Sequence, residues 1–542
     1  MNRHSTPAKA DPSASRAREH LARALEFHRN GRLPEAERLY QKVLRLRPEH
    51  FDALHMLGVI ALNAGRYEYA TDLISQAIRQ KAGVAAAHWH LGLALMHQER
   101  FAEAIVSFER QIALQGECLE PCMKIASALS RLGQLDQALA RCDCAISSRP
   151  DSAAAHLTRA IVLKDLEQHE HSLEACDRAI RLEPGLAEAW DKHGAALRDL
   201  GRFEEALESH RKAIELQPDF SLAQMHAGMV CLQTGDYANG WKLYEKRTHG
   251  GGPPRRRSWR QPCWTGELPL SGATILLHSE QGLGDTIQFC RYTRLVEERG
   301  AKVVLAVQPR LRALLRTLSP TVQVLSETET LPKFDLHCSL MSLPGAFGTT
   351  LQTIPWDGPY LRAEAARIAR WRARLGTEGF KIGICWQGSK LPIDVGRSFP
   401  LTLFQHLAAV PGVRLISLQK GIGSEQLNSL SPEIPVEDLG HDFDEGADAF
   451  LDTAAIMESC DLVITSDTSV AHLAGALARP TWVALKQVPD WRWLTGQENS
   501  PWYPSQRLFR QKRRGDWHAV FEQIRAELEV LLFSRFKHPG GM

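Results

Sequence analysis

The sequence predicts an α + α/β protein, in which a long helical repeat region is followed by an α/β region built of two halves. Over the first 250 residues, small residues recur at an interval of 34, and a fixed period of that length indicates a repeated structural unit. Beyond residue 271 the pattern changes to short apolar runs of strand length that alternate with helical stretches. Such runs are typical of parallel strands covered by helices on both faces.

The composition is that of a globular protein of two or three domains. The chain has 542 residues, of which 44% are apolar and 24% charged, and it is too long for one ordinary core. Its net charge of +2 gives no argument for nucleic acid as a partner. It has no apolar run of about 18 residues and no apolar segment typical of a signal peptide. We therefore expect a cytoplasmic protein without a membrane span.

Four sets of positions define the repeat. Small residues allow two helices to approach closely, a glycine before the second helix permits the turn, and a proline begins the next unit where it removes no helix hydrogen bond. Each unit should therefore be a helix hairpin, and seven fit between residues 17 and 250. The sets are Pro48, Ala82, Gly116, Pro150, Pro184, Pro218; Gly58, Gly92, Ala126, Ala160, Gly194, Gly228; Gly31, Gly65, Glu99, Gly133, Glu167, Gly201, Gly235; and Ala36, Ala70, Ala104, Ala138, Ser172, Ala206, Gly240.

The unit at 189–218, "AWDKHGAALRDLGRFEEALESHRKAIELQP", resembles the tetratricopeptide repeat in the order of its aromatic, small and proline positions. The resemblance implies a superhelix whose inner groove holds a protein or peptide partner. Tetratricopeptide glycosyltransferases of the O-linked N-acetylglucosamine type carry asparagines at one groove position, and this chain has none there. These residues either contact a partner or are only solvated. They are Met56, His90, Lys124, Thr158, Lys192 and His226.

The remaining chain divides around glycine- and proline-rich stretches. We expect residues 1–16 to be disordered, 251–271 to be a linker, 272–365 to form a first Rossmann-like half and 366–535 a second. The three arginines at 255–257 could meet an anionic ligand or be a solvated part of the linker. The eleven cysteines are an odd number and fall mostly in helical patterns, so we expect them to be reduced.

Parallel strands direct functional residues to the loops after their carboxyl ends. Three loops qualify: "SEQGLGD" after the first strand of the first half, "WQGSKLPIDVGRSFP" after the first strand of the second half, and "SDTSVAH" after "DLVIT". In the last loop a helix begins directly after Asp467, and the free backbone N–H groups of such a helix can bind phosphate or sugar hydroxyls. Alternatively, Asp467 or Ser469 is only a helix cap.

Taken together, these loops resemble the heptosyltransferase-like family 9 glycosyltransferases, which have the two-domain GT-B fold. The similarity rests on "GD" before a helix, on "RSFP", and on "SDTSVAHLAGALARPTW", and it spans about residues 270–530. The stretches "DTAAIMESCDLVITSDTS" and "DWRWLTGQENSPWYPSQRLFRQ" are similar to the bacterial subgroup that joins this domain to tetratricopeptide repeats.

The resemblance implies a role for Asp285 as the general base that removes a proton from the acceptor hydroxyl. A carboxylate in a cleft with few counter-charges has the raised pKa that this step needs. Gly282 and Gly284 would let the acceptor approach closely. Considered alone, "GLGD" is a tight turn that contains a carboxylate, and it is not a phosphate-binding P-loop because no Lys followed by Ser or Thr closes it.

The resemblance places donor recognition in the second half. Asp467, Thr468 and Ser469 match the family's "D-T-G" turn for the donor sugar and diphosphate, with serine in place of glycine. Arg397 stands where the family has a lysine that neutralises the departing nucleoside diphosphate. A second set, His472 and Glu425, could also face the donor, although His472 could equally be a buried core histidine.

We expect no metal and no cofactor besides the nucleotide-sugar co-substrate. The pair Cys142 and Cys144 has no partners at zinc-finger spacing, and the acidic run at 442–448 lacks the spacing of a calcium loop. The leading hypothesis is an inverting glycosyltransferase whose repeats select a protein or glycan acceptor. The alternatives are a non-catalytic scaffold with a degenerate GT-B domain and a sugar-nucleotide epimerase, which shares the two-domain fold. The sequence leaves open the sugar, the nucleotide base and the acceptor.

Overall fold

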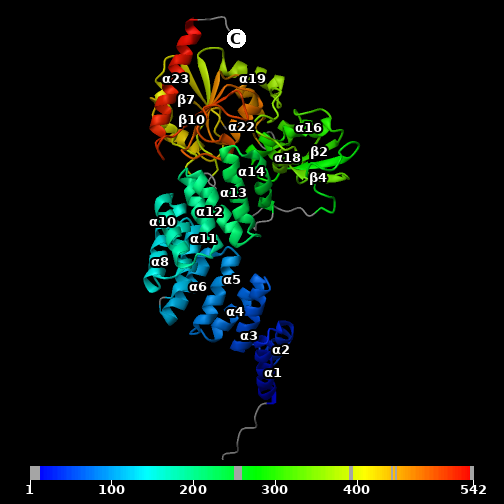
Figure 1. Ribbon diagram of the computed structural model, residues 1–542, viewed down its shortest axis with the longest axis vertical. Coiled ribbons are helices and arrows are strands. Elements are labelled where there is room, and N and C mark those ends of the chain that lie inside the picture. Colours follow the sequence, from blue (N-terminus) through cyan, green and yellow to red (C-terminus); the bar gives the residue numbers. More distant parts are fainter. Residues whose placement is uncertain are drawn as a thin grey trace, which may run out of the picture. The chain divides into compact units, whose positions relative to one another are not determined.

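The structure is a computed structural model, and it describes residues 12–116, 118–248, 259–389, 395–440, 443–445 and 449–537 (Figure 1). The chain divides into two compact units. The first comprises residues 1–200 with 215–217, and the second comprises residues 201–214 and 218–542. Among the described residues, no helix is both long enough and apolar enough to cross a bilayer.

The expected helical repeat is confirmed, because fourteen α-helices of the described part of the chain precede strand β1. The eleven in the first unit are α1 Pro12–Arg29, α2 Leu33–Leu46, α3 Phe51–Asn63, α4 Tyr67–Gln80, α5 Ala85–His97, α6 Phe101–Gln115, α7 Leu119–Arg131, α8 Leu135–Ser148, α9 Ala153–Asp165, α10 His169–Leu182 and α11 Ala187–Asp199. The second unit continues with α12 Phe203–Leu216, α13 Ser221–Thr234, α14 Tyr237–Tyr244 and the 3-10 helix η1 Glu245–Thr248.

The 34-residue sets have direct structural causes. A Cβ on Gly58 would lie 2.5 Å from the Ile74 side chain, and one on Gly92 would lie 2.4 Å from the Phe108 ring, so only glycine allows these helices to pack. The set that precedes each second helix has positive φ throughout. At two of its positions, Glu99 and Glu167, φ is 58° and 59°, a conformation that is unfavourable for a residue with a Cβ.

The second unit contains two parallel sheets. The first has the order β3-β2-β1-β4, with β1 Thr274–His278, β2 Lys302–Val307, β3 Gln323–Ser326 and β4 Leu336–Ser339. The second has the order β10-β9-β8-β5-β6-β7, with β5 Phe380–Cys385, β6 Val413–Ser417, β7 Val436–Glu437, β8 Leu462–Ser466, β9 Thr481–Leu485 and β10 Gln506–Arg510. Numbered within this half, its order is 3-2-1-4-5-6, that of a doubly wound Rossmann sheet.

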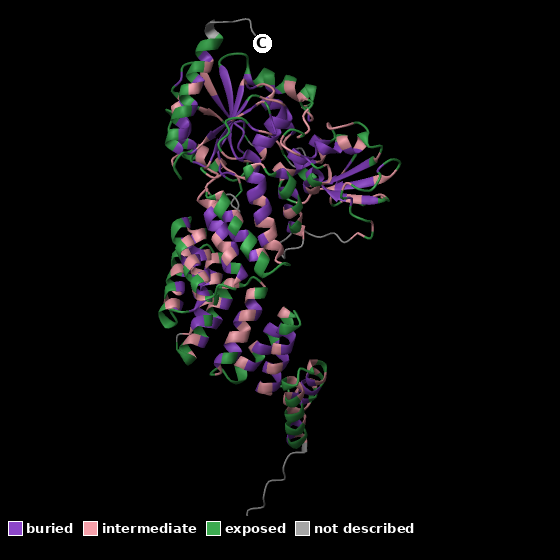
Figure 2. Ribbon diagram, viewed as in Figure 1, coloured by how far each residue is buried: buried purple, intermediate pink, exposed green. Residues whose placement is uncertain are grey.

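The second sheet is buried on both faces, as its continuous apolar runs predict. Strands β5, β8 and β9 are buried along their whole length and are drawn almost entirely in purple in Figure 2. Ile464 of β8 belongs to the core formed with α23 (Trp517–Lys537), whereas its neighbour Val463 belongs to the core that contains α22 (Ser469–Ala476). The two helices therefore cover opposite faces.

Several elements differ from the sequence expectation. Strands β3, β4, β7 and β10 do not match the continuous apolar runs by which strands were predicted, because they are short or mixed with polar residues. Helix α1 already begins at Pro12, within the segment expected to be disordered. The proposed linker is described from Trp259 onward, and its Trp264 is buried and donates its backbone N–H to the carbonyl of His337 on β4, at 2.8 Å. This part of 251–271 thus belongs to the first half. Arginines 255–257 lie outside the described residues.

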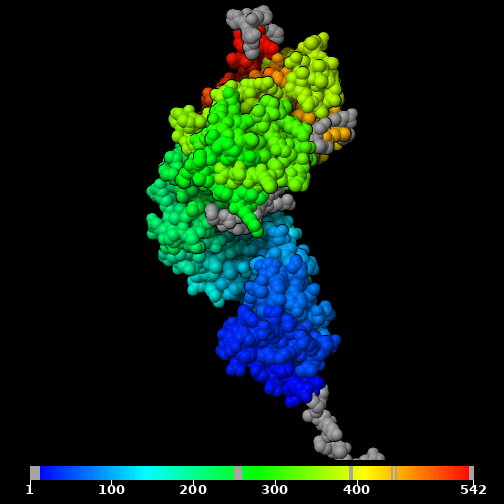
Figure 3. Space-filling model, turned by 90° about the vertical axis from the view of Figure 1, so that its right-hand side faces the viewer, coloured from blue at the N-terminus to red at the C-terminus, as the bar shows by residue number. Residues whose placement is uncertain are grey.

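Figure 3 shows the first half in green, next to the yellow-green residues that follow it in the sequence.

Part of the acidic run at 442–448 also lies outside the described residues. Within the described part, Asp444 accepts the backbone N–H groups of Asp452 and Thr453 at 2.8 and 3.2 Å. It therefore caps α21 (Leu451–Met457).

Candidate active site

The candidate site lies where the carboxyl ends of the two sheets bring several loops together. In each sheet the chain first adds strands on one side of its first strand and then continues on the other side. This switch lies between β1 and β4 in the first sheet and between β5 and β8 in the second. Ligands of doubly wound proteins bind outside the carboxyl ends of the strands at such switch points. The loops at 279–285 and 467–469 follow β1 and β8, and the loop that begins at Trp386 follows β5, so all three predicted loops start at a switch point.

Asp285 is at the third position of helix α15 (Leu283–Phe289). Its Oδ2 accepts the backbone N–H of Gly282 at 2.8 Å, which closes the turn and fixes the carboxylate. The end of β2 supports the same loop, because Gln308 accepts the Thr286 hydroxyl at 2.9 Å and donates to the Gln281 carbonyl at 2.9 Å. The Asp285 side chain keeps 19% of its exposure and remains accessible.

Arg492 reaches Asp285 from the other half. It belongs to the 3-10 helix η8 (Trp491–Trp493), and its Nη2 donates to Asp285 Oδ1 at 2.5 Å. Its Nη1 donates to Asp490 Oδ1 at 2.7 Å and its Nε to Gln288 at 2.9 Å. The guanidinium carbon lies 4.3 Å from the ring centroid of Trp491. Arg492 is thus held on all sides, with only 7% exposure.

Arg397 extends this network to the donor turn predicted from the sequence. Its Nε lies 3.5 Å from Asp467 Oδ2, and its Nη2 lies 3.8 Å from Asp490 Oδ2. The charges therefore alternate along a continuous series, Asp285, Arg492, Asp490, Arg397 and Asp467. Two arginines and one aspartate thus connect Asp285 to Asp467, which lies 182 positions later in the sequence.

The three carboxylates of the series differ in their electrostatics. Burial raises the pKa of Asp285, against the opposing effect of Arg492. Burial likewise raises the pKa of Asp467, against the effect of Arg397. Burial also acts to raise the pKa of Asp490, but the positive charges of Arg492 and Arg397 outweigh it and lower this pKa to about 2. Asp490 is therefore the most acidic of the three carboxylates, whereas the pKa values of Asp285 and Asp467 are raised.

The turn 467–469 leads into α22 without a side-chain cap. Thr468 is the N-cap residue, and its side chain makes no bond to the helix backbone. Its hydroxyl instead lies 3.3 Å from that of Thr465. Ser469 is the first residue of α22. Among the described residues, the buried hydroxyl of Ser466 has no hydrogen-bond partner, so this turn has polar capacity that a ligand could use.

His472 supports the site from within. It is 5% exposed, its Nδ1 lies 3.0 Å from the Tyr503 hydroxyl, and its ring stacks on Trp493 with centroids 5.4 Å apart. Burial lowers its pKa to about 3, so the ring is neutral at physiological pH. A Cβ on Gly284 would lie 2.8 Å from His472 Cδ2. Gly284 therefore allows α15 to pack against α22, and its expected role in acceptor approach stays a prediction.

Within the described part of the chain, Glu425 makes no hydrogen bond or ion pair with the residues of this network. It lies in the 3-10 helix η6 (Ser424–Ser429) after β6 and accepts the backbone N–H of Gly423 at 2.7 Å. The neighbouring loops are joined by Gln419, whose Oε1 accepts the N–H groups of Trp386 and Gln387 at 3.2 and 3.1 Å. Glu425 is exposed and remains a prediction as a donor contact.

Four residues at this site were not found from the sequence: Asp490, Arg492, Arg247 and Glu280. Asp490 and Arg492 follow β9, so their position after a strand at the same edge was a usable signal. Glu280 lies inside the quoted loop "SEQGLGD". Arg247 belongs to the end of the repeat region and donates to both carboxylate oxygens of Glu280, each at 2.8 Å. This pairing leaves no local sequence pattern.

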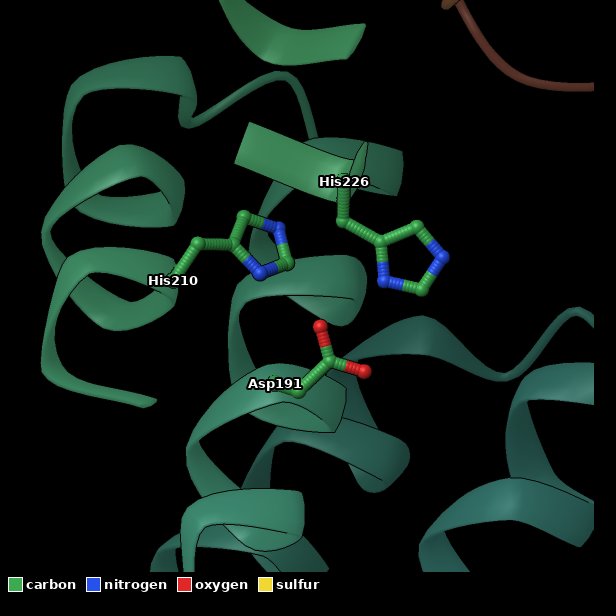
Figure 4. A group of neighbouring side chains, drawn as sticks. All are labelled: Asp191, His210 and His226. Atoms are coloured by element: carbon green, nitrogen blue, oxygen red, sulfur yellow. The ribbon is translucent and has the colours of Figure 1, made fainter. Parts of the chain in front are cut away.

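The predicted groove residues of the repeats are partly covered. Met56, His90, Thr158, Lys192 and His226 are half-buried, whereas Lys124 is exposed. His90 Nδ1 lies 3.0 Å from His55 Nε2. His226 on α13 lies beside His210 on α12, with ring centroids 5.6 Å apart (Figure 4). Their roles in partner binding remain predictions.

Comparison with known proteins identifies the repeats. A family model described as "Tetratricopeptide repeat" matches residues 21–85, 70–116, 123–187 and 192–252. The N-terminal helices are tetratricopeptide repeats. Repeats of this kind bind protein or peptide partners, and this is the role that they indicate here.

Protein FlbA of Caulobacter vibrioides is 28% identical over 338 residues, which cover 57% of this chain and 55% of that protein. The chain therefore spans about half the length of this curated relative. The crystal structure of YrrB, titled "a TPR protein with an unusual peptide-binding site", is 22% identical, with a TM-score of 0.28, and covers 34% of this chain and 95% of that one. A tetratricopeptide repeat protein from Parabacteroides merdae is 15% identical, with a TM-score of 0.41, and covers 44% and 94%.

Proposed function

We propose that the α/β region is a metal-independent, inverting glycosyltransferase that uses a nucleotide sugar, and that the tetratricopeptide repeats select its protein or glycan acceptor. In this proposal the two sheets are the halves of a GT-B fold. Donor recognition belongs to the second half and the acceptor's base to the first. The resemblance of the loops at 279–285, 395–400 and 466–472 to family 9 glycosyltransferases motivates the reaction class.

The observation that carries the proposal is the series of ion pairs between the two switch points. It brings Asp285, the proposed base, and Asp467, in the proposed donor turn, into one network. Transfer between two bound substrates requires their sites to be held in a fixed mutual geometry. The series supports such a connection, because it links Asp285 of the first half to four charged residues of the second half.

The chemistry of the network suits sugar transfer. Burial raises the pKa of Asp285, which makes its carboxylate a stronger base toward an acceptor hydroxyl. As the acceptor oxygen attacks the anomeric carbon, its proton passes to Asp285 and the nucleoside diphosphate departs with the bonding electron pair. Arg397 and Arg492 could stabilise that departing charge. His472 is neutral and would add no charge there.

A panel of nucleotide sugars tests the proposal. Purified wild type should hydrolyse or transfer the sugar of at least one donor, and Asp285→Asn should lose about 100-fold or more in rate while nucleotide binding persists. Asp335→Asn is the matched control, because Asp335 accepts the Thr274 N–H at 2.8 Å at the opposite end of β1. A donor that turns over equally in Asp285→Asn and wild type would contradict the assigned base.

A non-catalytic scaffold is the second candidate, and one observation favours it. Both carboxylate oxygens of Asp285 are engaged, one by Arg492 and one by the Gly282 N–H. If no nucleotide sugar binds or turns over while the repeats still capture a partner, the scaffold is the better description. An epimerase would instead release free sugar without any acceptor, so product analysis without acceptor distinguishes that third hypothesis.

A further inference from the structure

The seventh repeat, which we define as α13, α14 and η1, contacts the loop that carries Asp285. Arg247 of η1 donates from Nε and Nη2 to the two carboxylate oxygens of Glu280, each at 2.8 Å. The two side chains are 4% and 6% exposed. Glu280 stands two residues after β1 and two before Gly282. This paired contact therefore fixes the loop at its start.

Further hydrogen bonds surround this ion pair. The Arg247 Nη1 donates to Glu245 at 2.9 Å, and its Nη2 donates to the Ser342 hydroxyl at 2.8 Å. The Ser339 hydroxyl, at the end of β4, donates to Glu280. Burial acts to raise the pKa of Glu280, but the bonds from Arg247 outweigh it, so its pKa lies below the usual range. The pair is thus ionised and has little freedom to rearrange.

The same repeat contacts the loop that carries Arg492. Gln233 of α13 donates to the Pro489 carbonyl at 2.8 Å. Trp241 of α14 packs edge-on against Trp491, with ring centroids 5.4 Å apart, and Tyr244 packs against the same ring at 5.8 Å. Trp491 lies under the Arg492 guanidinium. The repeat therefore holds both partners of the Asp285–Arg492 contact.

We propose that the seventh repeat positions the loops of the candidate active site. In this proposal Arg247 is a positioning residue that holds the Glu280–Asp285 loop in the geometry required by Asp285. This inference rests on the proposed function. It gives the repeat region a second role besides partner binding, because displacement of α14 would move both loops at once. Arg247 touches neither reacting group and acts through Glu280.

The test uses the full chain and two independent readouts. In Arg247→Met, amide hydrogen exchange of peptides covering 279–289 should accelerate by about ten-fold or more, because the local opening of the loop is less opposed. For the donor found in the panel, kcat should fall by about 100-fold, the cost of a misplaced catalytic group, with a much smaller change in KM. Arg247→Lys keeps the charge without the paired geometry, and we expect it to be intermediate.

Arg414→Met is the matched control. Arg414 makes an equivalent paired contact with Glu437, at 2.7 and 2.9 Å, in the second sheet between β6 and β7, and its loss should leave exchange at 279–289 and kcat unchanged. Where Arg247→Met does not fold, Glu280→Gln weakens the same contact with almost no change of shape.

The possible results distinguish a failure of the positioning role of Arg247 from a failure of the proposed glycosyltransferase function. Unchanged exchange at 279–289 in both Arg247→Met and Glu280→Gln overturns the inference. Accelerated exchange with an unchanged kcat also overturns it, since the loop geometry would then not matter to the reaction. If wild type transfers no sugar from any donor, the proposed function fails, and the exchange readout alone then decides whether Arg247 positions the loop.

Discussion

Asp285 Oδ1 and Arg492 Nη2 lie 2.5 Å apart although 207 residues separate them in the chain. This contact joins the loop after β1 to the loop after β9, and so it joins the two sheets at their carboxyl ends. Because Arg492 also binds Asp490, the contact is the first link in the series of ion pairs that reaches Asp467. The electrostatics of Asp285 therefore depend on a residue of the other half.

The first prediction concerns the pH dependence of the proposed transfer. The base must be unprotonated, so kcat/KM should fall as the pH falls through the raised pKa of Asp285. Arg492 opposes that rise. In Arg492→Met the acidic limb of the pH–rate profile should therefore move to higher pH, with a greater loss of rate at pH 6 than at pH 8. Arg492→Lys keeps the charge and should move it less, and an unmoved limb in Arg492→Met would contradict this assignment.

The second prediction concerns the approach of α15 to α22. Gly284→Ala places a Cβ 2.8 Å from His472 Cδ2, and because His472 is fixed by Tyr503 and Trp493, the helices must separate. We expect a loss of about 1–3 kcal/mol in unfolding free energy, as for other overpacked sites. Denaturant unfolding measures it. Gly282→Ala is the control, since its φ is −68° and its nearest contact is 3.2 Å; an equal loss in both variants would speak against the packing explanation.

Most of the fold could be predicted because local patterns specify it. The 34-residue interval identified the helix hairpins, since close packing of helices requires small residues at fixed positions. The strands β1, β2, β5, β6, β8 and β9 were visible as continuous apolar runs. The short strand β3 (Gln323–Ser326) and the edge strand β10 (Gln506–Arg510) carry polar residues, and their pairing depends on neighbours distant in the sequence.

The site was predictable only where a residue directly follows a strand. Asp285 and Asp467 stood out because each lies between an apolar run and a helix. Arg492 could not be given a partner in the same way, because an ion pair across 207 residues leaves no periodic pattern. Acceptor access stays the predicted reason for Gly284, and the structure adds a role in helix packing against His472. Side chains that meet only after folding set both of these roles.

The third prediction concerns His472 and acid stability. Burial lowers the pKa of the folded-state ring to about 3, whereas an unfolded histidine titrates near 6.5. The unfolded state therefore binds one more proton below pH ~6.5, and the stability contribution of neutral His472 is full above that pH and is lost as the pH falls toward 3. This group should contribute a slope of about 1 kcal/mol per pH unit. His472→Gln should show a shallower decline between pH 6.5 and 4 in denaturant titrations, and an identical slope would contradict the assignment.

The fourth prediction concerns the strained turns of the repeats. Glu167 has φ of 59° at a position where five of the seven repeats have glycine, and a left-handed conformation costs a residue with a Cβ about 1–2 kcal/mol. Glu167→Gly should therefore raise the unfolding free energy by about 1 kcal/mol, after the larger chain entropy of glycine is subtracted. Gly133→Ala, at the equivalent turn with φ of 75°, should lower it by a similar amount. Urea unfolding monitored by circular dichroism measures both, and because the two changes are opposite in sign, a loss of stability in Glu167→Gly would show that contacts of its side chain outweigh the backbone strain.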